Sequence, residues 1–349
     1  MRVLVTGAFG NIGTSTVREL LAQGHLVRCF DLRTKANEQA AKRFGGLAEV
    51  AWGDLRKPAD LLEAVKDQEV VIHLAFIIPS LSATGVDMQK EPEWARAINV
   101  GGTSNLLEAV KVQPKPARIL FASSIATYGR TQHLRPPRRV TDPLLGTDPY
   151  AQHKIECEQM VRGSGLRWCI LRLAATLPIS MKMDAAMFDV PLENRMEYCH
   201  TRDVGLALAN AASSRDVWGK VLNVGGGGRC QHTYREIAQE ILNGLGVGML
   251  PEKAFTKVPF CTDWLDTEES QRLLRYQRHT LKDYVRDMRR ALGFRRHLAK
   301  LFRPVVRAML LSKSAVLHPN RRTGGRGGLS TAKQGLKASK RRPTHVRIG

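Results

Sequence analysis

A tyrosine and a lysine four residues apart form the first pair in this sequence that could do chemistry. Tyr150 and Lys154 would share one face of a helix predicted over 149–163, about one turn from each other. An ammonium group near a phenol stabilises the phenolate and lowers the pKa of the tyrosine from about 10 toward neutral pH. Tyr150 could then act as a general acid or base at a hydroxyl or carbonyl group.

A glycine-rich turn near the N-terminus is the second chemical feature. It reads TGAFGNIG over 6–13, follows an apolar run and opens an amphipathic helix. Gly7 would permit the tight turn, Gly10 the close approach of backbone to a pyrophosphate, and Gly13 the packing of helix on strand. The turn therefore predicts a dinucleotide whose phosphates lie at a helix N-terminus. The residues expected to bind it here are Gly7, Phe9, Gly10, Asn11, Ile12 and Gly13.

A carboxylate at the end of the next predicted strand bears on which dinucleotide binds. Asp31 follows Gly13 by 18 residues, where it could accept hydrogen bonds from the adenosine ribose hydroxyls. Its charge would repel a 2′-phosphate, although Arg33 could offset that repulsion. We therefore expect NAD, with NADP as the weaker alternative, and place Asp31, Leu32 and Arg33 at the ribose.

The elements that would position these residues follow an α/β pattern. Short apolar, β-branched runs alternate with helical patterns, as in a parallel sheet covered on both faces. After Leu173 the alternation loosens, and prolines and glycines divide the chain into pieces that would form a smaller cap. Strands are expected at 2–6, 27–31, 48–52, 69–75, 117–123 and 167–173, and helices at 12–23, 36–44, 59–66, 94–111 and 149–163.

A series of short motifs follows the glycine turn in order. They are GDL at 53–55, IHLA at 72–75, NVGGT at 99–103, FASSIATYG at 121–129, YAQHK at 150–154 and HTRDV at 200–204. With them the sequence resembles the extended short-chain dehydrogenase family, also called the NAD-dependent epimerase/dehydratase family, over roughly residues 1–290. The resemblance implies a Rossmann-type doubly wound parallel sheet with a small C-terminal substrate-binding cap.

The resemblance also assigns roles to single residues. Ser124, Tyr150 and Lys154 would be catalytic, with Ser124 hydrogen-bonding the reacting oxygen and Lys154 also binding the nicotinamide ribose. Asp54 is similar to the family's adenine contact. The other cofactor-binding residues implied are Leu55, Leu74, Ala75 and Asn99, with Tyr150 and Lys154. No metal site is expected.

Two departures from the family pattern narrow the reaction. Dehydratases and decarboxylases of the family carry acidic residues just after the catalytic Ser or Thr, where this chain has Ile125 and Ala126. Nucleotide-sugar epimerases usually have a Phe-Asn pair and a long insertion after the sixth strand, where this chain reads RLAAT over 172–176. We therefore expect an NAD-dependent oxidoreductase or epimerase that acts by reversible hydride transfer at a secondary alcohol or ketone of a small hydroxy or keto compound. Two alternatives stay open, namely a nucleotide-sugar epimerase and an NAD-sensing regulatory protein without turnover.

The net charge of +22 is concentrated at the C-terminus. Residues 295–349 carry 15 Lys or Arg and no Asp or Glu, which leaves 39 basic and 32 acidic residues before them. A basic amphipathic helix is predicted over 295–318 and a disordered basic tail over 319–349. The helix could contact an anionic membrane through 295–313, or pack on the body with its charges in solvent, which is the more usual arrangement. The tail lacks aromatic residues to stack on bases, which disfavours nucleic acid.

The sequence also predicts a domain organisation and a location in the cell. An NAD-binding domain with the catalytic residues is expected over 1–173, and a substrate-binding region over 174–294, interleaved with the last sheet elements. Six scattered cysteines without a Cys-x-x-Cys pair indicate neither a zinc site nor a disulfide framework. No signal peptide and no apolar run of about 18 residues is visible. A cytoplasmic enzyme is expected, peripheral to a membrane if the basic helix makes that contact, and the family's frequent dimer suggests a homodimer.

Overall fold

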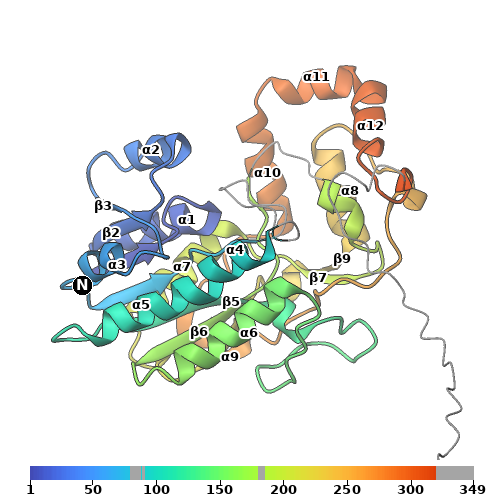
Figure 1. The fold of residues 1–349 in the computed structure, drawn as a ribbon. Helices are drawn as coiled ribbons and strands as arrows, with labels where there is room; N and C mark the ends of the chain where they lie inside the picture. Colours follow the sequence, from blue (N-terminus) through green and yellow to red (C-terminus); the bar gives the residue numbers. More distant parts are fainter. Residues whose placement is uncertain (79–87, 89–90, 180–184, 320–349) are drawn as a thin grey trace, which may run out of the picture.

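A seven-stranded parallel sheet forms the centre of the molecule (Figure 1). The computed structural model describes residues 1–78, 88, 91–179 and 185–319. The strand order is β3-β2-β1-β4-β5-β6-β8, so the chain leaves β1 in one direction for β2 and in the other for β4. The strands are β1 (Arg2–Thr6), β2 (Leu26–Asp31), β3 (Glu49–Trp52), β4 (Val70–His73), β5 (Arg118–Ser124), β6 (Trp168–Leu173) and β8 (Val221–Val224).

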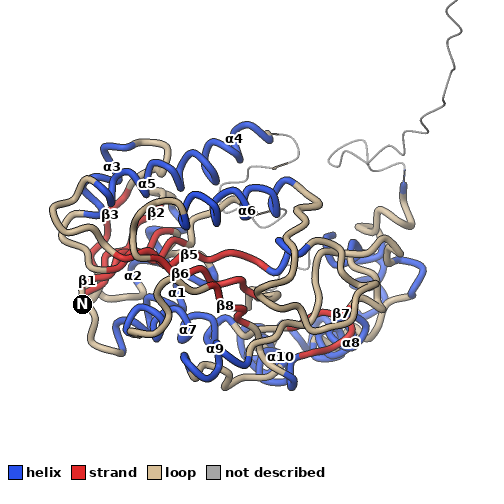
Figure 2. Tube along the Cα trace, turned by 90° about the horizontal axis from the view of Figure 1, so that it is seen from below, coloured by secondary structure: helices blue, strands red, loops and turns tan. Residues whose placement is uncertain are grey.

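Helices cover both faces of this sheet (Figure 2). One layer consists of α3 (Pro58–Val65), α5 (Gly102–Lys111) and α6 (Pro149–Arg162), and the other of α1 (Asn11–Ala22), α7 (Thr201–Ser213) and α9 (Glu268–Leu274). Each layer buries its own apolar cluster against the sheet. This is the Rossmann-type α/β fold, and the six expected strands are all present near their expected places.

The remaining elements include two short helices near the sheet and a cap beyond its carboxyl edge. Near the sheet lie α2 (Lys35–Lys42) and α4 (Pro92–Arg96). In the cap, an antiparallel pair of β7 (Arg195–Glu197) and β9 (Gln231–Thr233) packs with α8 (Tyr234–Gly244) and α10 (Leu281–Leu292) around a separate apolar core. The sheet also takes β8 and α7 from the part of the chain after Leu173, so sheet and cap segments alternate there.

The helix expected over 94–111 is interrupted. It consists of α4, a π-helical turn over Ala97–Gly101 and α5. The turn contains Asn99, whose carbonyl accepts a hydrogen bond from the Thr103 hydroxyl at 2.5 Å. Hydrophobic spacing alone does not distinguish such a turn from a continuous helix, because the π-turn adds one residue without ending the helical path.

The basic helix expected over 295–318 is also divided. The chain forms α11 (Arg295–Leu301) and α12 (Arg303–Leu311), separated at Phe302, whose backbone leaves the helical region. Pro304 lies in the first turn of α12, where its missing N–H costs no hydrogen bond. The expected tail over 319–349 lies, except for Pro319, outside the described residues.

A buried ion pair holds α6 on the sheet. Arg172 of β6 donates from Nη2 to the Glu158 carboxylate at 2.7 Å and from Nε at 2.9 Å. Both side chains are at most 2% exposed. Ser123 of β5 donates to the same carboxylate at 2.5 Å, and Tyr128 accepts from the Arg172 guanidinium at 3.0 Å. Three elements are therefore joined through one carboxylate.

We expect Arg172→Met to lower the free energy of unfolding by about 3–5 kcal/mol, because it leaves the Glu158 carboxylate buried without its partner. Urea denaturation measures the change. Adding Glu158→Gln should recover much of the loss, since the uncompensated charge is then gone. Arg235→Met, which removes two exposed ion pairs in the cap, is the matched control and should cost less than about 1 kcal/mol. Equal losses for the two arginines would contradict this account of the pair.

Candidate active site

A cavity of about 350 Å³ lies at the carboxyl ends of the strands. This is where doubly wound sheets bind ligands, next to the point at which the strand order reverses. Most of the residues predicted to bind a cofactor lie around it. Its lining includes Gly7, Gly10, Asn11, Ile12, Gly13, Asp31, Leu32, Asp54, Leu55, Leu74, Ala75, Tyr150 and Lys154.

The glycine turn has the geometry that an anion site requires. Gly7 has a φ of +67°, and a Cβ there would lie 2.8 Å from the Cα of Ala75. A Cβ on Gly13 would collide with the Gly7 carbonyl, so helix α1 packs closely on the turn. Gly10 caps α1 without a side-chain hydrogen bond, and the first turn holds no acidic residue. The N–H groups at this helix end therefore remain available for a phosphate.

Asp31 lines the cavity and is held by its neighbours. Its carboxylate accepts hydrogen bonds from the backbone N–H groups of Phe9 at 3.0 Å and Leu32 at 2.9 Å, and from the Asn37 amide at 3.1 Å. Burial raises the pKa of Asp31, and these hydrogen bonds oppose that rise. Four lone-pair sites on a carboxylate leave room for a further donor such as a ribose hydroxyl.

Two residues predicted to bind the cofactor do not line the cavity, namely Arg33 at the ribose and Phe9 in the glycine turn. Arg33 is exposed and forms an ion pair with Glu38 at 2.8 Å. The Phe9 ring is buried against Trp52, with 5.4 Å between the ring centroids. Phe9 therefore meets the site through its N–H group, and the charge of Arg33 is already paired.

Asp54 lines the cavity beside Leu55 and forms a close ion pair with Arg56. The Nη2 of Arg56 lies 2.5 Å from the Asp54 carboxylate. The Arg56 guanidinium lowers the pKa of Asp54. The carboxylate is therefore ionised at neutral pH, and both of its oxygens accept hydrogen bonds from Arg56.

Asn99 has a place that the motif alone does not reveal. Its side chain is fully buried, accepts from the N–H of Ile77 at 2.6 Å and donates to the Ile77 carbonyl at 3.1 Å. It does not line the cavity among the described residues. Asn99 instead holds the segment after β4, which carries Leu74, Ala75 and Ile77 along the cavity.

The three predicted catalytic residues lie together at the end of β5 and the start of α6. The Ser124 side chain is near enough to the Tyr150 phenol to lower its pKa, and Tyr150 lines the cavity. Lys154 lies one turn further along α6 and donates to the Ala122 carbonyl at 2.6 Å. Its ammonium also lies 3.5 Å from the ring centroid of Phe76, which in turn meets the Tyr150 ring edge-on.

The protonation states differ from the expectation that Lys154 would lower the pKa of Tyr150. Burial raises the pKa of Tyr150 to about 12, although the nearby Ser124 side chain opposes the rise. Burial likewise lowers the pKa of Lys154 to about 7. The physical reason is that both groups lie in apolar surroundings, and Lys154 points to Ala122 and Phe76. In this state the Tyr150 phenol is a proton donor at neutral pH.

Several cavity residues were not predicted from the sequence. Asn37 fixes the Asp31 carboxylate, and Phe76 contacts both Tyr150 and Lys154. The position of Phe76, directly after the IHLA motif, was the available signal. The side of the cavity near Tyr150 is mainly apolar in its described part, with Phe76, Ile77, Ile78, Leu173, Thr176 and Pro178 along it.

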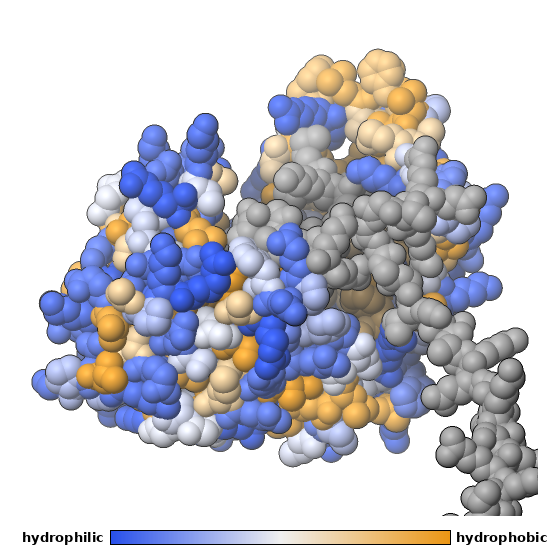
Figure 3. Space-filling model, in the orientation of Figure 1, coloured by the Kyte–Doolittle hydropathy of each residue, from blue (hydrophilic) through white to orange (hydrophobic). Residues whose placement is uncertain are grey.

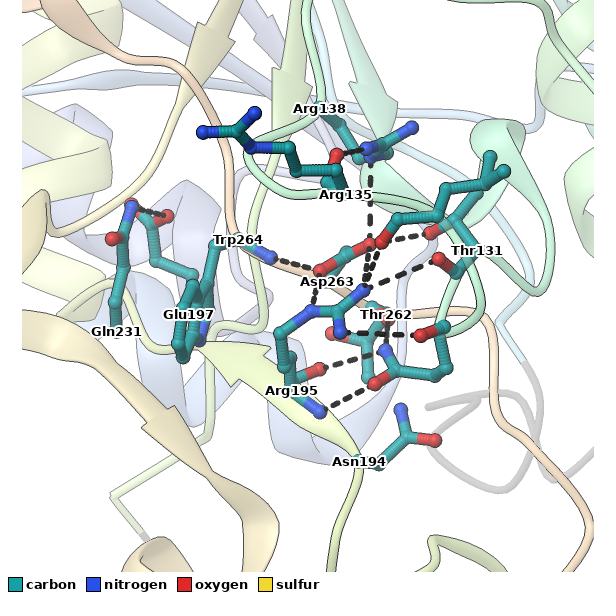
Figure 4. Close-up of polar contacts among 12 residues, drawn as sticks. Thr131, Arg135, Arg138, Asn194, Arg195, Glu197, Gln231, Thr262, Asp263 and Trp264 are labelled. Carbon is teal, nitrogen blue, oxygen red and sulfur yellow. Dashed lines mark hydrogen bonds and ion pairs between the residues drawn. The ribbon is translucent and has the colours of Figure 1, made fainter.

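A second polar network joins the cap to the loop before α6 (Figure 4). The Arg195 Nε donates to the Asp263 carboxylate at 2.7 Å, and the Arg138 Nε lies 3.4 Å from the same carboxylate. Thr131 donates to it at 2.7 Å, and Gln132 bonds the Arg195 backbone. Asp263 is fully buried and pairs with both arginines. Arg138 also pairs with Asp142 at 3.1 Å, so carboxylates already neutralise the charges of both arginines.

The charges around the cavity follow from these pairings. Among the described residues that line it, Lys154 is the one cationic side chain. No cluster of three His, Cys, Asp or Glu that could hold a metal ion occurs in the described part of the chain. None of the described helices is long and apolar enough to cross a membrane.

The strand order of the sheet and the glycine turn, which lies where that order reverses, define a Rossmann-type dinucleotide-binding protein. Its cavity lies beside adjacent Ser, Tyr and Lys side chains. The model of the NAD dependent epimerase/dehydratase family matches residues 3–177. The chain belongs to this family.

Individual relatives agree with that placement. The UDP-glucose 4-epimerase of Halalkalibacterium halodurans is 33% identical over 173 residues, which are 48% of this chain and 46% of that protein. The chain thus spans about half the length of the curated relatives it matches.

Solved structures share the fold over most of the chain. A UDP-glucose-4-epimerase from Stenotrophomonas maltophila with bound NAD and formylated UDP-arabinopyranose has a TM-score of 0.68 at 24% identity, covering 84% of this chain and 98% of that one. A short-chain dehydrogenase/reductase superfamily protein from Agrobacterium tumefaciens with bound NAD has a TM-score of 0.67 at 21% identity, covering 87% and 100%.

The burial of Lys154 predicts a pH dependence of stability. Its pKa is about 7 in the folded protein and 10.5 as the ordinary value, so between these values the unfolded chain binds one more proton. The free energy of unfolding should therefore rise with pH from about 7 to about 10 more steeply for wild type than for Lys154→Met. Urea denaturation of both proteins without added cofactor, across this range, measures the difference. Parallel pH profiles would show that Lys154 stays charged in the folded state.

Proposed function

We propose that this protein is an NAD-dependent oxidoreductase or epimerase that transfers hydride reversibly at a secondary alcohol or ketone carbon. The observation that carries the proposal is the Tyr150 phenol, which lies near Ser124 and lines the same cavity as the glycine turn. A dinucleotide site alone would support a sensor equally well. A partly buried proton donor beside it supports turnover.

The cavity residues fit a dinucleotide, and NAD in particular. The uncapped N-terminus of α1 would hold the pyrophosphate, and Asp31 would accept from the adenosine ribose. The pairing of Arg33 with Glu38 supports NAD over NADP, because it leaves Asp31 without a free cation to offset a 2′-phosphate. Bound NAD would supply the hydride acceptor and donor.

The chain's own residues would manage the proton. When a ketone is reduced at this site, Tyr150 would donate its phenolic proton to the oxygen as hydride reaches the carbon. In the reverse direction the Tyr150 phenolate would take the proton of the alcohol as the carbon loses hydride. Ser124 would hold the reacting oxygen, and the Lys154 ammonium would stabilise the phenolate in the transition state. Ile125 is buried in the core, so the position after Ser124 offers no second acid or base.

The lining supports a small, largely apolar hydroxy or keto substrate. Arg138 and Arg195 are paired with Asp263, and the described lining near Tyr150 is apolar. A second candidate, a nucleotide-sugar epimerase, is supported by the likeness to UDP-glucose 4-epimerases. Assays with NAD of a panel that contains small hydroxy or keto compounds and nucleotide sugars would discriminate the two candidate functions. We also propose that the protein forms a homodimer, as the family resemblance suggests.

We expect Tyr150→Phe to lower kcat by about 10²–10⁴-fold while NAD binding stays near wild type, because the substitution removes the proton donor and keeps the ring. Absorbance of NADH and calorimetric titration with NAD give the two readouts. Tyr234→Phe is the matched control, since it removes a cap hydroxyl bonded to the Met187 carbonyl. Wild-type turnover by Tyr150→Phe would refute the assigned role.

We expect Asp31→Asn to weaken NAD binding by about tenfold and to reduce the preference over NADP, because it replaces charge-assisted hydrogen bonds with neutral ones and removes the repulsion of a 2′-phosphate. Calorimetric titration with each dinucleotide measures both effects. Asp67→Asn, at an exposed turn before β4, should change neither affinity. A variant that binds NAD as tightly as wild type would place the ribose elsewhere.

A further inference from the structure

The last two described helices, α11 and α12, expose apolar side chains that an ordinary surface helix would bury. The C-terminal arch, residues 294–311, rises from α10, crosses over in α11 and descends in α12 (Figure 1). No residue of α11 is buried, and Leu310 is the one buried residue of α12. An amphipathic helix normally directs its apolar stripe toward the core. Here Val306, Leu310 and Leu311 of α12 pack on the cap core, but a further set of apolar side chains on the arch faces solvent.

Exposed apolar side chains gather on this arch. Among the described residues, seven of fifteen exposed large hydrophobic side chains lie between 294 and 316. Figure 3 shows them as an apolar patch over α11 and α12. Six of them lie on the arch and form its outward stripe, spaced three or four residues apart in each of α11 and α12. These six are Phe294, Leu298, Leu301, Phe302, Val305 and Met309.

Two arginines of α12 bind the body. Arg303 donates to the Val247 carbonyl at 2.9 Å, and Arg307 donates to the carbonyls of Val247, Gly248 and Met249 at 2.7–3.0 Å. These contacts occupy the carbonyl groups that follow helix α8. Gly248 has a φ of +72°, and a side chain there would collide with the Arg303 guanidinium. The loop after α8 is therefore shaped to receive the arginines, which fixes the apolar stripe outward.

We propose that the outward stripe of the C-terminal arch docks on an anionic lipid bilayer. Such a surface takes Phe and Leu side chains at the acyl boundary and attracts the cations beside them. Arg295, Arg296 and Lys300 are exposed around the stripe, and no Asp or Glu follows Asp287 in the sequence. A second copy of the chain is a poorer occupant, since a two-fold contact would bring these cations against their own copies.

The test is flotation of the full chain with vesicles, which does not depend on the proposed enzymatic activity. One set is phosphatidylcholine alone, and the other contains about one third phosphatidylglycerol to provide the negative surface charge. The face variant is Leu301→Glu with Phe302→Glu. The control variant is Leu47→Glu with Val112→Glu, which places the same charges at similarly exposed apolar positions away from the arch. The basic tail is identical in both.

We expect wild type and the control variant to float with the phosphatidylglycerol vesicles, and the face variant to bind at least about tenfold more weakly. Circular dichroism confirms that both variants are folded. Equal flotation of the two variants would overturn the proposal and assign binding to the tail. Absence of wild-type flotation would also overturn it. So would a wild-type dimer that the face variant converts to a monomer without any vesicle binding, because the stripe would then cover a second copy.

Discussion

The buried ion pair of Glu158 and Arg172 is the interaction on which the site depends. Tyr150, Lys154 and Glu158 follow each other at intervals of four residues, so they share one face of α6. Fixing Glu158 to β6 through Arg172 and to β5 through Ser123 sets the rotation of the whole helix. The Tyr150 phenol then reaches Ser124, and Lys154 reaches Ala122. A buried pair adds little net stability, but it defines one arrangement, since any other rotation would leave a charge unpaired in the core.

The two ends of the cavity differ in polarity, which suits a ligand with a polar cofactor part and an apolar reacting part. At the glycine turn, N–H groups and Asp31 offer hydrogen bonds in fixed directions. Near Tyr150, apolar side chains exclude water. The same burial raises the pKa of Tyr150 and lowers that of Lys154, so both equilibria are shifted toward the neutral forms before any ligand arrives. Charge that develops near Tyr150 during a reaction would be stabilised mainly by the dipoles of nearby protein groups, because little solvent reaches that end of the cavity.

Many of the arginines in this protein stabilise the fold and do not bind a ligand. Arg172 secures α6, while Arg138 and Arg195 converge on Asp263, and Arg303 and Arg307 bind the loop after α8. The guanidinium group suits these places because it donates several hydrogen bonds in a plane and remains charged when buried. The large positive charge of the chain is thus partly internal structure. It does not by itself indicate an anionic ligand at the cavity.

The sequence by itself determined the sheet, its helices and the dinucleotide turn, since local apolar periods and glycine spacing follow from short-range geometry. It also brought together Tyr150 and Lys154, which share a helix, and it indicated an amphipathic segment near the C-terminus. Tertiary structure decided the rest. It placed Asn99 on the backbone of Ile77, turned Lys154 toward Phe76, and faced the apolar stripe of the arch outward. Those outcomes depend on partners distant in sequence, and periodicity tells which side chains share a face without telling what that face meets.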